Sequence, residues 1–302
     1  MPLLERFTQS AWDEYVRSLD QIIFAAIERD ITNRALDAHD LVHGCTEVVK
    51  LRRGQEPDYS VRGVAPIYNF TYLAQRVSSL ALAFTKIELA DNVVVLDIGA
   101  GTGATSIALQ MFRNGRRIRL TASDPSAEMQ AAATALDCPD LSINHLARPV
   151  EYVLRTVPPI DHVWDMIVLS ACLPYRFGQS QTATQGRSAG LNIARRLAPG
   201  GCVLVVEPKS KLTEPRRMRA WLSAAGLRTV ELSSDDLNKD ELVLERRLPR
   251  ATSKLAEWSG RMTFTRELVG DAATLIHDSA GWLYAVKSWN PRASEHYLVA
   301  SA

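Results

Sequence analysis

The sequence lacks the long apolar runs that mark membrane and secreted proteins. No uninterrupted apolar run reaches membrane-spanning length. The first residues, Met1 to Glu14, mix acidic and aromatic side chains and lack the apolar segment of a signal peptide. These absences predict a cytoplasmic protein without a membrane partner.

Cysteine is also scarce. The four cysteines are Cys45, Cys138, Cys172 and Cys202, and no two of them have the C-x-x-C spacing of a zinc or iron–sulfur site. We therefore expect no metal centre, and we expect these thiols to be buried in a reducing compartment.

The chain has no excess of one charge. Lys and Arg number 35, Asp and Glu number 34, and the formal net charge is +1. Nucleic acid is not predicted as a partner, because a broad basic surface is not expected from this balance. The 302 residues, 46% hydrophobic and 23% charged, have an ordinary globular composition, with room for one large domain and an appendage.

One stretch near residue 100 carries the strongest local pattern. Residues 93–98 open with three valines, which is typical of a strand buried on both faces. Gly99, Gly101 and Gly103 follow at alternate positions, and residues 104–112 have the apolar spacing of a helix. The predicted unit is a strand, a tight loop and a helix, whose free N-terminal N–H groups suit a carboxylate or phosphate.

Two kinds of ligand fit such a loop. Dinucleotide folds use G-x-G-x-x-G or G-x-G-x-x-A, and Gly99, Gly101 and Ala104 match the second form. The pattern acid-x-Gly-x-Gly-x-Gly is matched at every position, starting from Asp97 and ending at Gly103. This second pattern resembles the first motif of class I methyltransferases that depend on S-adenosylmethionine (SAM).

Three later signals follow in the order that this family has. Residues 118–123 predict a strand ending at Asp124, whose carboxylate suits a ribose diol or, alternatively, the N-cap of the next helix. Residues 141–146 and 164–170 predict two further strands. Residues 197–208 read Leu-Ala-Pro-Gly-Gly followed by an apolar run, a phrase frequent in the family before its fifth strand.

The resemblance covers roughly residues 61–302 and is strongest over 93–207. It implies an α/β, Rossmann-like fold with a mostly parallel seven-stranded sheet and helices on both faces. It also implies SAM as cofactor and S-adenosylhomocysteine as product. No adenine contact is assigned, because residues 147–151 match the family poorly there. The residues that the resemblance assigns to the cofactor are Asp97, Gly99, Ala100, Gly101, Thr102, Gly103, Asp124, Pro125, Met129, Ser170, Tyr68 and Tyr72.

Two amphipathic helices are predicted before this domain. Residues 7–29 place on one face Trp12, Tyr15, Val16, Leu19, Ile22, Ile23, Ala26 and Ile27. Residues 31–51 do the same with Ile31, Ala35, Ala38, Val42, Cys45 and Val49. Short helices need a packing partner. We therefore expect residues 1–60 to form a helical lid or extension, and a homodimer through these helices is a further expectation.

A third helical pattern, from Ser60 to Ile87, leads into the glycine-loop strand. The resemblance places such a helix at the mouth of the cofactor site. Tyr68, Tyr72 and Arg76 lie at helical spacing along it, and either contact the cofactor carboxylate or substrate, or form an amphipathic rim.

The segment after the strand at 164–170 is expected to meet the methyl acceptor. Ligands of open α/β sheets lie at the carboxyl ends of the strands. Tyr175 offers a ring and a hydroxyl, and Arg176 offers a fork for an acceptor carboxylate or phosphate. The general base is left open among Tyr175, His277 and His145. Residues 235–280 read as an insertion before final strands at 282–289 and 296–300.

The sequence is compatible with four functions. The first is methyl transfer from SAM to an oxygen, nitrogen or carbon atom of a small-molecule substrate, for example in secondary metabolism. The second is an RNA or protein methyltransferase, and the near-neutral charge weighs against RNA. The third is an oxidoreductase that uses NAD. The fourth is a non-catalytic scaffold, against which the intact Asp97, glycine loop and Asp124 argue.

Overall fold

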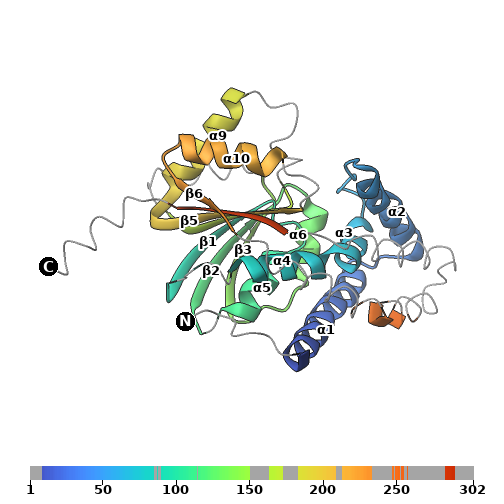
Figure 1. Ribbon diagram of the computed structural model, residues 1–302. Helices are drawn as coiled ribbons and strands as arrows, with labels where there is room; N and C mark the ends of the chain where they lie inside the picture. The colour runs from blue at the N-terminus through green and yellow to red at the C-terminus, as the bar shows by residue number, and fades with distance from the viewer. Residues whose placement is uncertain are drawn as a thin grey trace.

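The computed structural model describes residues 9–84, 87, 90–113, 115–149, 163–172, 183–208, 213–232, 247, 249–251, 253–254, 257 and 283–289. Its seven-stranded sheet has the order β3-β2-β1-β4-β5-β7-β6 (Figure 1). The strands are β1 (Asn92–Ile98), β2 (Arg117–Ser123), β3 (Leu141–Leu146), β4 (Trp164–Ser170), β5 (Leu197–Pro208), β6 (Arg228–Glu231) and β7 (Leu283–Trp289).

The first five strands run parallel to one another, and β7 runs antiparallel to both of its neighbours, β5 and β6. The predicted α/β class and mostly parallel sheet are confirmed. The predicted strand at 282–289 is β7, whereas residues 296–300 lie outside the described residues.

Helices cover both faces of the sheet (Figure 1). One face packs on α9 (Ala183–Arg196) and α10 (Thr213–Ala224), which bury Ile193, Met218 and Leu222. The other face shares a core with α4 (Ala74–Phe84), α5 (Ala104–Phe112) and α6 (Ala127–Thr134). The strand side chains alternate between the two cores, as β1 shows with Val95 on one side and Leu96 on the other.

The N-terminal helices belong to that second core. Helix α1 (Gln9–Asn33) buries the face predicted for it, including Val16, Leu19 and Ile23. These side chains join one apolar cluster with residues of the sheet, such as Val95. In the described residues, therefore, α1 packs as part of the same core as the sheet.

The prediction for the second helix was wrong in its start and in its buried face. Helix α2 spans Ala38–Val49 and buries Leu41, Gly44, Cys45 and Val48, while Ala35 and Val42 are exposed. The reason is a chain reversal, in which Ala35 takes a left-handed φ of 49°. Asp37 then caps α2 through a capping box with Asp40, so the helical phase restarts there.

The third predicted helix is confirmed, with a break in its regularity. It consists of α3 (Val64–Tyr68), a π turn η2 (Asn69–Leu73) and α4. All the side chains predicted to face the core are buried: Ile67, Phe70, Leu73, Val77, Leu80, Ala81 and Phe84. We call residues 64–84 the mouth helix.

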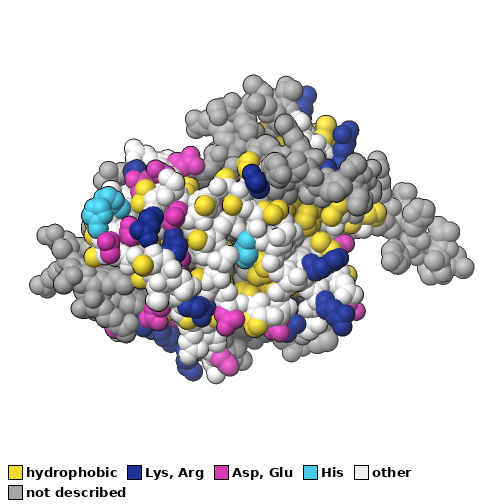
Figure 2. Space-filling view, turned by 180° about the vertical axis from the view of Figure 1, so that it is seen from behind, with side chains coloured by type: hydrophobic (Ala, Val, Ile, Leu, Met, Phe, Trp, Pro, Cys, Tyr) yellow, Lys and Arg dark blue, Asp and Glu magenta, His cyan; other side chains and the backbone are white. Residues whose placement is uncertain are grey.

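The described surface has no single dominant charge on the face shown in Figure 2, where basic and acidic side chains are interspersed. All four cysteine side chains are buried. Among the residues that the structure describes, no helix is long and apolar enough to cross a membrane.

Candidate functional site

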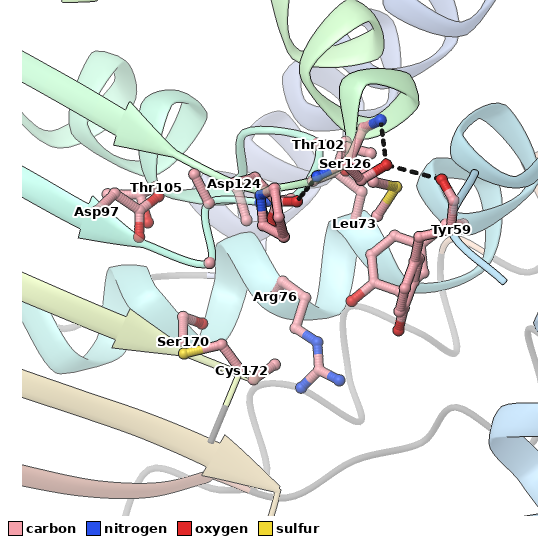
Figure 3. Close-up of a pocket in the computed structure, with 18 of the residues that line it drawn as sticks. Tyr59, Leu73, Arg76, Asp97, Thr102, Thr105, Asp124, Ser126, Ser170 and Cys172 are labelled. Atoms are coloured by element: carbon pink, nitrogen blue, oxygen red, sulfur yellow. Dashed lines mark hydrogen bonds between the residues drawn. The ribbon is translucent and has the colours of Figure 1, made fainter. Parts of the chain in front are cut away.

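A cavity of about 230 Å³ opens at the carboxyl ends of β1, β2 and β4 (Figure 3). Carboxyl ends of parallel strands are where open α/β sheets bind ligands. The mouth helix and the start of α6 close the other sides. The lining residues are Glu56, Tyr59, Tyr68, Leu73, Arg76, Asp97, Gly99, Ala100, Gly101, Thr102, Ala104, Thr105, Asp124, Pro125, Ser126, Met129, Ser170, Ala171 and Cys172.

The glycine loop is anchored to β2 and bends tightly around its end. The Gly99 and Ala100 N–H groups both donate to the Ser123 carbonyl, at 2.8 and 3.0 Å. Gly101 has a left-handed φ of 53°, and a Cβ added to it would meet no other atom closer than 3.7 Å, at Met129 Cε. The backbone therefore leaves room for a ligand beside Gly101, and a side chain there would fill that room.

Asp97 lies at the bottom of the cavity with 1% of its surface exposed. The pKa of its carboxyl is raised from 3.8 to about 7, mainly because of burial; a hydrogen bond with Thr105 lowers this pKa and the neighbouring Asp124 carboxylate raises it. Among the described residues, its Oδ1 atom is buried without a hydrogen-bond partner. A buried acceptor left open at a cavity is suited to a cationic donor from a ligand.

Asp124 is fixed at the end of β2 by two backbone donors. Its Oδ2 accepts from the Gly101 N–H at 3.0 Å, and its Oδ1 accepts from the Ser126 N–H at 2.9 Å. The N-cap of α6 is Ser126, whose hydroxyl accepts from the Met129 N–H at 3.2 Å and donates to the Tyr59 carbonyl at 2.7 Å. The alternative role of Asp124 as the helix cap is therefore wrong, and its carboxylate faces the cavity.

Arg76 brings a positive charge to the cavity from the mouth helix. Figure 3 shows its side chain extending from the helix into the cavity. Burial lowers the pKa of its guanidinium, but interactions with Tyr68, Glu207 and Tyr72 raise the pKa above its usual value, so the group is cationic. Its Nε atom is buried and has no hydrogen-bond partner among the described residues.

The structure brings most of the predicted cofactor residues together. Asp97, Asp124, Met129, Ser170 and Tyr68 all line the cavity, as do most of the glycine-loop residues. Two of the predicted residues, Gly103 and Tyr72, are not among the lining residues, although the Tyr72 ring lies 5.3 Å from the Tyr68 ring.

None of the candidate catalytic and acceptor residues is found in the lining of the described cavity. His145 lies half-buried in β3 and does not line the cavity, and burial lowers its pKa. Tyr175, Arg176 and His277 lie outside the described residues. Their roles stay predictions.

Sequence reasoning missed Glu56 and Tyr59, which line the cavity from the segment that precedes the mouth helix. Their position depends on a bond between distant parts of the chain, from the Ser126 hydroxyl to the Tyr59 carbonyl. No local pattern carries such a signal. Thr105, by contrast, is the second residue of the helix after the loop, and its position directly behind the loop would have marked it as a candidate.

The sheet order decides between the two folds that use such a glycine loop. A dinucleotide fold has six parallel strands in the order 3-2-1-4-5-6. Here an antiparallel strand, β7, lies between β5 and β6. The chain has the class I methyltransferase fold. The oxidoreductase alternative loses its structural support.

Comparisons with known proteins find similar solved structures but no matching sequence. Neither a protein-family model nor a curated protein matches the sequence. Among solved structures, it is similar to a phosphoethanolamine N-methyltransferase 2 from Haemonchus contortus, with 14% identity, 70% of this chain and 52% of that chain covered, and a TM-score of 0.45.

Two further similar structures are the cyclopropane synthase MmaA2 from Mycobacterium tuberculosis and a geranyl diphosphate C-methyltransferase from Streptomyces coelicolor. The first has 15% identity, covers 77% of this chain and 85% of that one, and has a TM-score of 0.38. The second has 13% identity, covers 70% and 79%, and has a TM-score of 0.40. We therefore take the activity from the residues of this chain.

Proposed function

We propose that this protein is a SAM-dependent methyltransferase that acts on an oxygen, nitrogen or carbon atom of a small-molecule acceptor. The observation that supports it is the buried Asp97 carboxylate, whose Oδ1 has no partner among the described residues and faces a cavity beside the glycine loop. SAM carries an ammonium, a carboxylate and a ribose diol, and the cavity has a matching group for each of these three.

The residues present fit this cofactor. Asp97 would accept from the ammonium, and the Arg76 guanidinium, together with Tyr68, would hold the carboxylate. The Asp124 carboxylate lines the cavity, and a carboxylate can accept more than two hydrogen bonds, which suits the ribose hydroxyls. The open side of Gly101 gives the ligand space against the backbone.

When bound, SAM supplies a methyl group that its positive sulfur already activates for in-line displacement. The protein's own contribution is then alignment and exclusion of water. Asp97 and Arg76 fix the two ends of the amino-acid moiety, and Asp124 fixes the sugar. The described end of β4, Ser170 to Cys172, forms the wall where the acceptor would approach. Tyr175 and Arg176, just beyond it, are proposed to bind the acceptor.

Residues 1–60 are proposed to cover the acceptor side of the cavity. Two observations support this. Glu56 and Tyr59 line the cavity, and α1 packs in the same core as the mouth helix. This arrangement favours a fixed wall over a separate docking module, and so a small acceptor over RNA or a protein. The homodimer and the cytoplasmic location expected from the sequence stay predictions.

Calorimetric titration with S-adenosylhomocysteine and with NAD tests the cofactor. We expect the first to bind and the second to give no heat. Mass spectrometry of the purified protein is an independent measurement, because a bound nucleoside that co-purifies can be identified directly. Binding of NAD alone would overturn the proposal. Turnover is then measured as transfer of label from SAM to a panel of small phenols, amines, carboxylates and phosphates.

A further inference from the structure

The mouth helix contains an irregularity that the cavity alone does not explain. Between α3 and α4 lies the π turn η2, Asn69–Leu73, in the middle of an otherwise buried helix. A π turn accommodates one extra residue and interrupts the regular hydrogen-bond ladder. Asn69 at its start is 0% exposed, and neither of its side-chain amide atoms has a hydrogen-bond partner among the described residues. Such a feature costs stability and is common at functional sites.

The π turn changes which side chains share a face of the helix. Tyr68 precedes it and Arg76 follows it, eight positions later. In a regular α-helix, eight residues turn through about 800°, which is about 80° beyond two full turns. The extra residue of a π turn removes roughly 100° of that rotation and leaves about 700°, close to two full turns.

The structure places Tyr68 and Arg76 on the same face of the mouth helix, as this rotation requires. Tyr68 and Arg76 both line the cavity, and a hydrogen bond that Arg76 donates to the Tyr68 hydroxyl is one of the interactions that raise the pKa of Arg76. Without the π turn, the two side chains would diverge by about 80° around the helix axis. The pair that faces the ligand therefore depends on the π turn.

One buried side chain from far along the chain holds this turn from outside the cavity. Arg247 is 0% exposed, and its Nη1 donates to the Phe70 carbonyl of the π turn at 2.9 Å. Its Nε donates to Asp20 Oδ1 on α1 at 2.8 Å. Its guanidinium carbon lies 5.4 Å from the centre of the Phe24 ring and 5.8 Å from that of the Phe70 ring.

We propose that Arg247 is a positioning residue for the ligand site, which acts by holding the π turn and thereby keeps Tyr68 and Arg76 on one face of the mouth helix. Arg247 itself does not line the cavity. A planar guanidinium suits this task, because it donates in two fixed directions at once, to α1 and to the mouth helix. A buried ion pair is by itself weak evidence for added stability, so conformational specificity is the role that we test.

The test needs a variant that removes the guanidinium without leaving a buried charge. Arg247→Met alone would leave the buried Asp20 carboxyl without its nearest cation, and would destabilise the fold. We therefore compare Asp20→Asn/Arg247→Met with Asp20→Asn, in which Arg247 still reaches the Phe70 carbonyl. Because Asp20→Asn leaves the buried Arg247 without its counter-charge, its thermal unfolding and ligand affinity are first compared with those of the wild type. Arg250→Met is the matched control, since its Nη1 lies 3.9 Å from the same Asp20 and its side chain is 40% exposed.

The first readout is affinity for S-adenosylhomocysteine, measured by calorimetry, and it rests on the proposed function. We expect the double variant to bind about ten-fold more weakly or worse than Asp20→Asn, as for the loss of a charge-assisted contact. Arg250→Met should bind like the wild type. In an Arg76→Met background, removing Arg247 should cause no further loss, because both changes disable the same contact. An equal loss in both backgrounds, or no loss in either, would overturn the proposal.

The second readout needs no ligand and separates this inference from the proposed function. Crystal structures of Asp20→Asn and of the double variant should show the π turn in the first and a regular helix in the second, with Tyr68 and Arg76 no longer in contact. An intact π turn in the double variant would refute the inference, even if the wild type binds no S-adenosylhomocysteine. If the double variant does not fold, Arg247→Lys takes its place in both readouts. Its single nitrogen keeps the charge beside Asp20 but cannot reproduce the two separate bonds.

Discussion

Replacing Asp97 by Asn is the most direct test of the site. Ionising this buried carboxyl is unfavourable in the ligand-free protein, and its Oδ1 atom is open to a hydrogen bond from a ligand. The pKa of Asp97 is raised from 3.8 to about 7 in the ligand-free protein. Each pKa unit corresponds to about 1.4 kcal/mol, so ionising this buried group costs about 4 kcal/mol more than ionising it in the unfolded chain. A ligand ammonium at Oδ1 would recover part of that free energy.

The direction of the pH effect follows from the raised pKa. Stability that comes from a protonated Asp97 is fully present below about pH 3.8 and is lost as the pH rises through about 7. Asp97→Asn keeps the neutral form at every pH. We therefore expect this variant to unfold at a higher temperature than the ligand-free wild type at pH 8, and the gap to shrink toward pH 5. Thermal unfolding followed by circular dichroism measures both.

Binding should show the opposite preference. At pH 8 the ionised Asp97 accepts a charge-assisted bond worth about 1.5–3 kcal/mol, so Asp97→Asn should bind S-adenosylhomocysteine about ten- to a hundred-fold more weakly. At pH 5.5 the wild-type carboxyl is mostly protonated, and the two affinities should converge. The ratio of the affinities cancels any titration of the ligand itself. A ratio that stays constant from pH 5.5 to 8 would show that Asp97 does not bind the ligand through its charge.

Further substitutions test the other groups of the site. Asp124→Ala should weaken S-adenosylhomocysteine binding about ten- to a hundred-fold in calorimetry, and unchanged affinity would exclude a ribose contact. Gly101→Val should abolish binding, because its side chain fills the open side of the loop and φ is 53°; binding within a factor of two of wild type would contradict this. Ala171→Gly should raise the free energy of unfolding by about 1 kcal/mol in urea, because Ala171 holds a left-handed φ of 53°. Tyr175→Phe and Arg176→Ala should raise KM for the acceptor in the labelled-methyl assay while cofactor affinity stays constant, and wild-type kinetics in both would remove this segment from the acceptor site.

The parts of the fold that the sequence predicted well are those fixed by local pattern. The helix at 104–112 and the strands at 141–146 and 164–170 match the structure residue for residue. In each, the spacing of the apolar residues is typical of the element that it forms, so the pattern can be recognised without knowledge of distant contacts. Asp97 and Asp124 could be predicted for a similar reason, because each stands at a fixed distance from the glycine loop.

The predictions that failed concern features set by the phase of a helical repeat or by contacts between distant parts of the chain. The phase of α2 was wrong because the capping box of Asp37 and Asp40 restarts the helix, and the apolar pattern alone does not mark that restart. The π turn is likewise invisible to a period of 3.6, since all the predicted core positions of the mouth helix are still buried. Its partner, Arg247, is separated from Phe70 by 177 residues and sits in a segment that reads only as a charged insertion.

Two parts of the chain outside the sheet, helix α1 and the late segment with Arg247, both contact the mouth helix. These contacts affect how the protein holds its cofactor. Helix α1 contacts the mouth helix where the Tyr15 and Ser78 hydroxyl oxygens lie 3.1 Å apart. Arg247 contacts the mouth helix at the Phe70 carbonyl and also donates to Asp20 on α1. Lys254 lies 2.8 Å from Glu28 on α1 and so adds another contact between α1 and this late part of the chain. The glycine loop and Asp124 are held by the sheet itself. The mouth helix packs on the sheet core and is held by the added segments as well, so changes in those segments would move Tyr68 and Arg76 and leave the loop in place. Cofactor affinity in this protein should therefore respond to residues that never touch the cofactor.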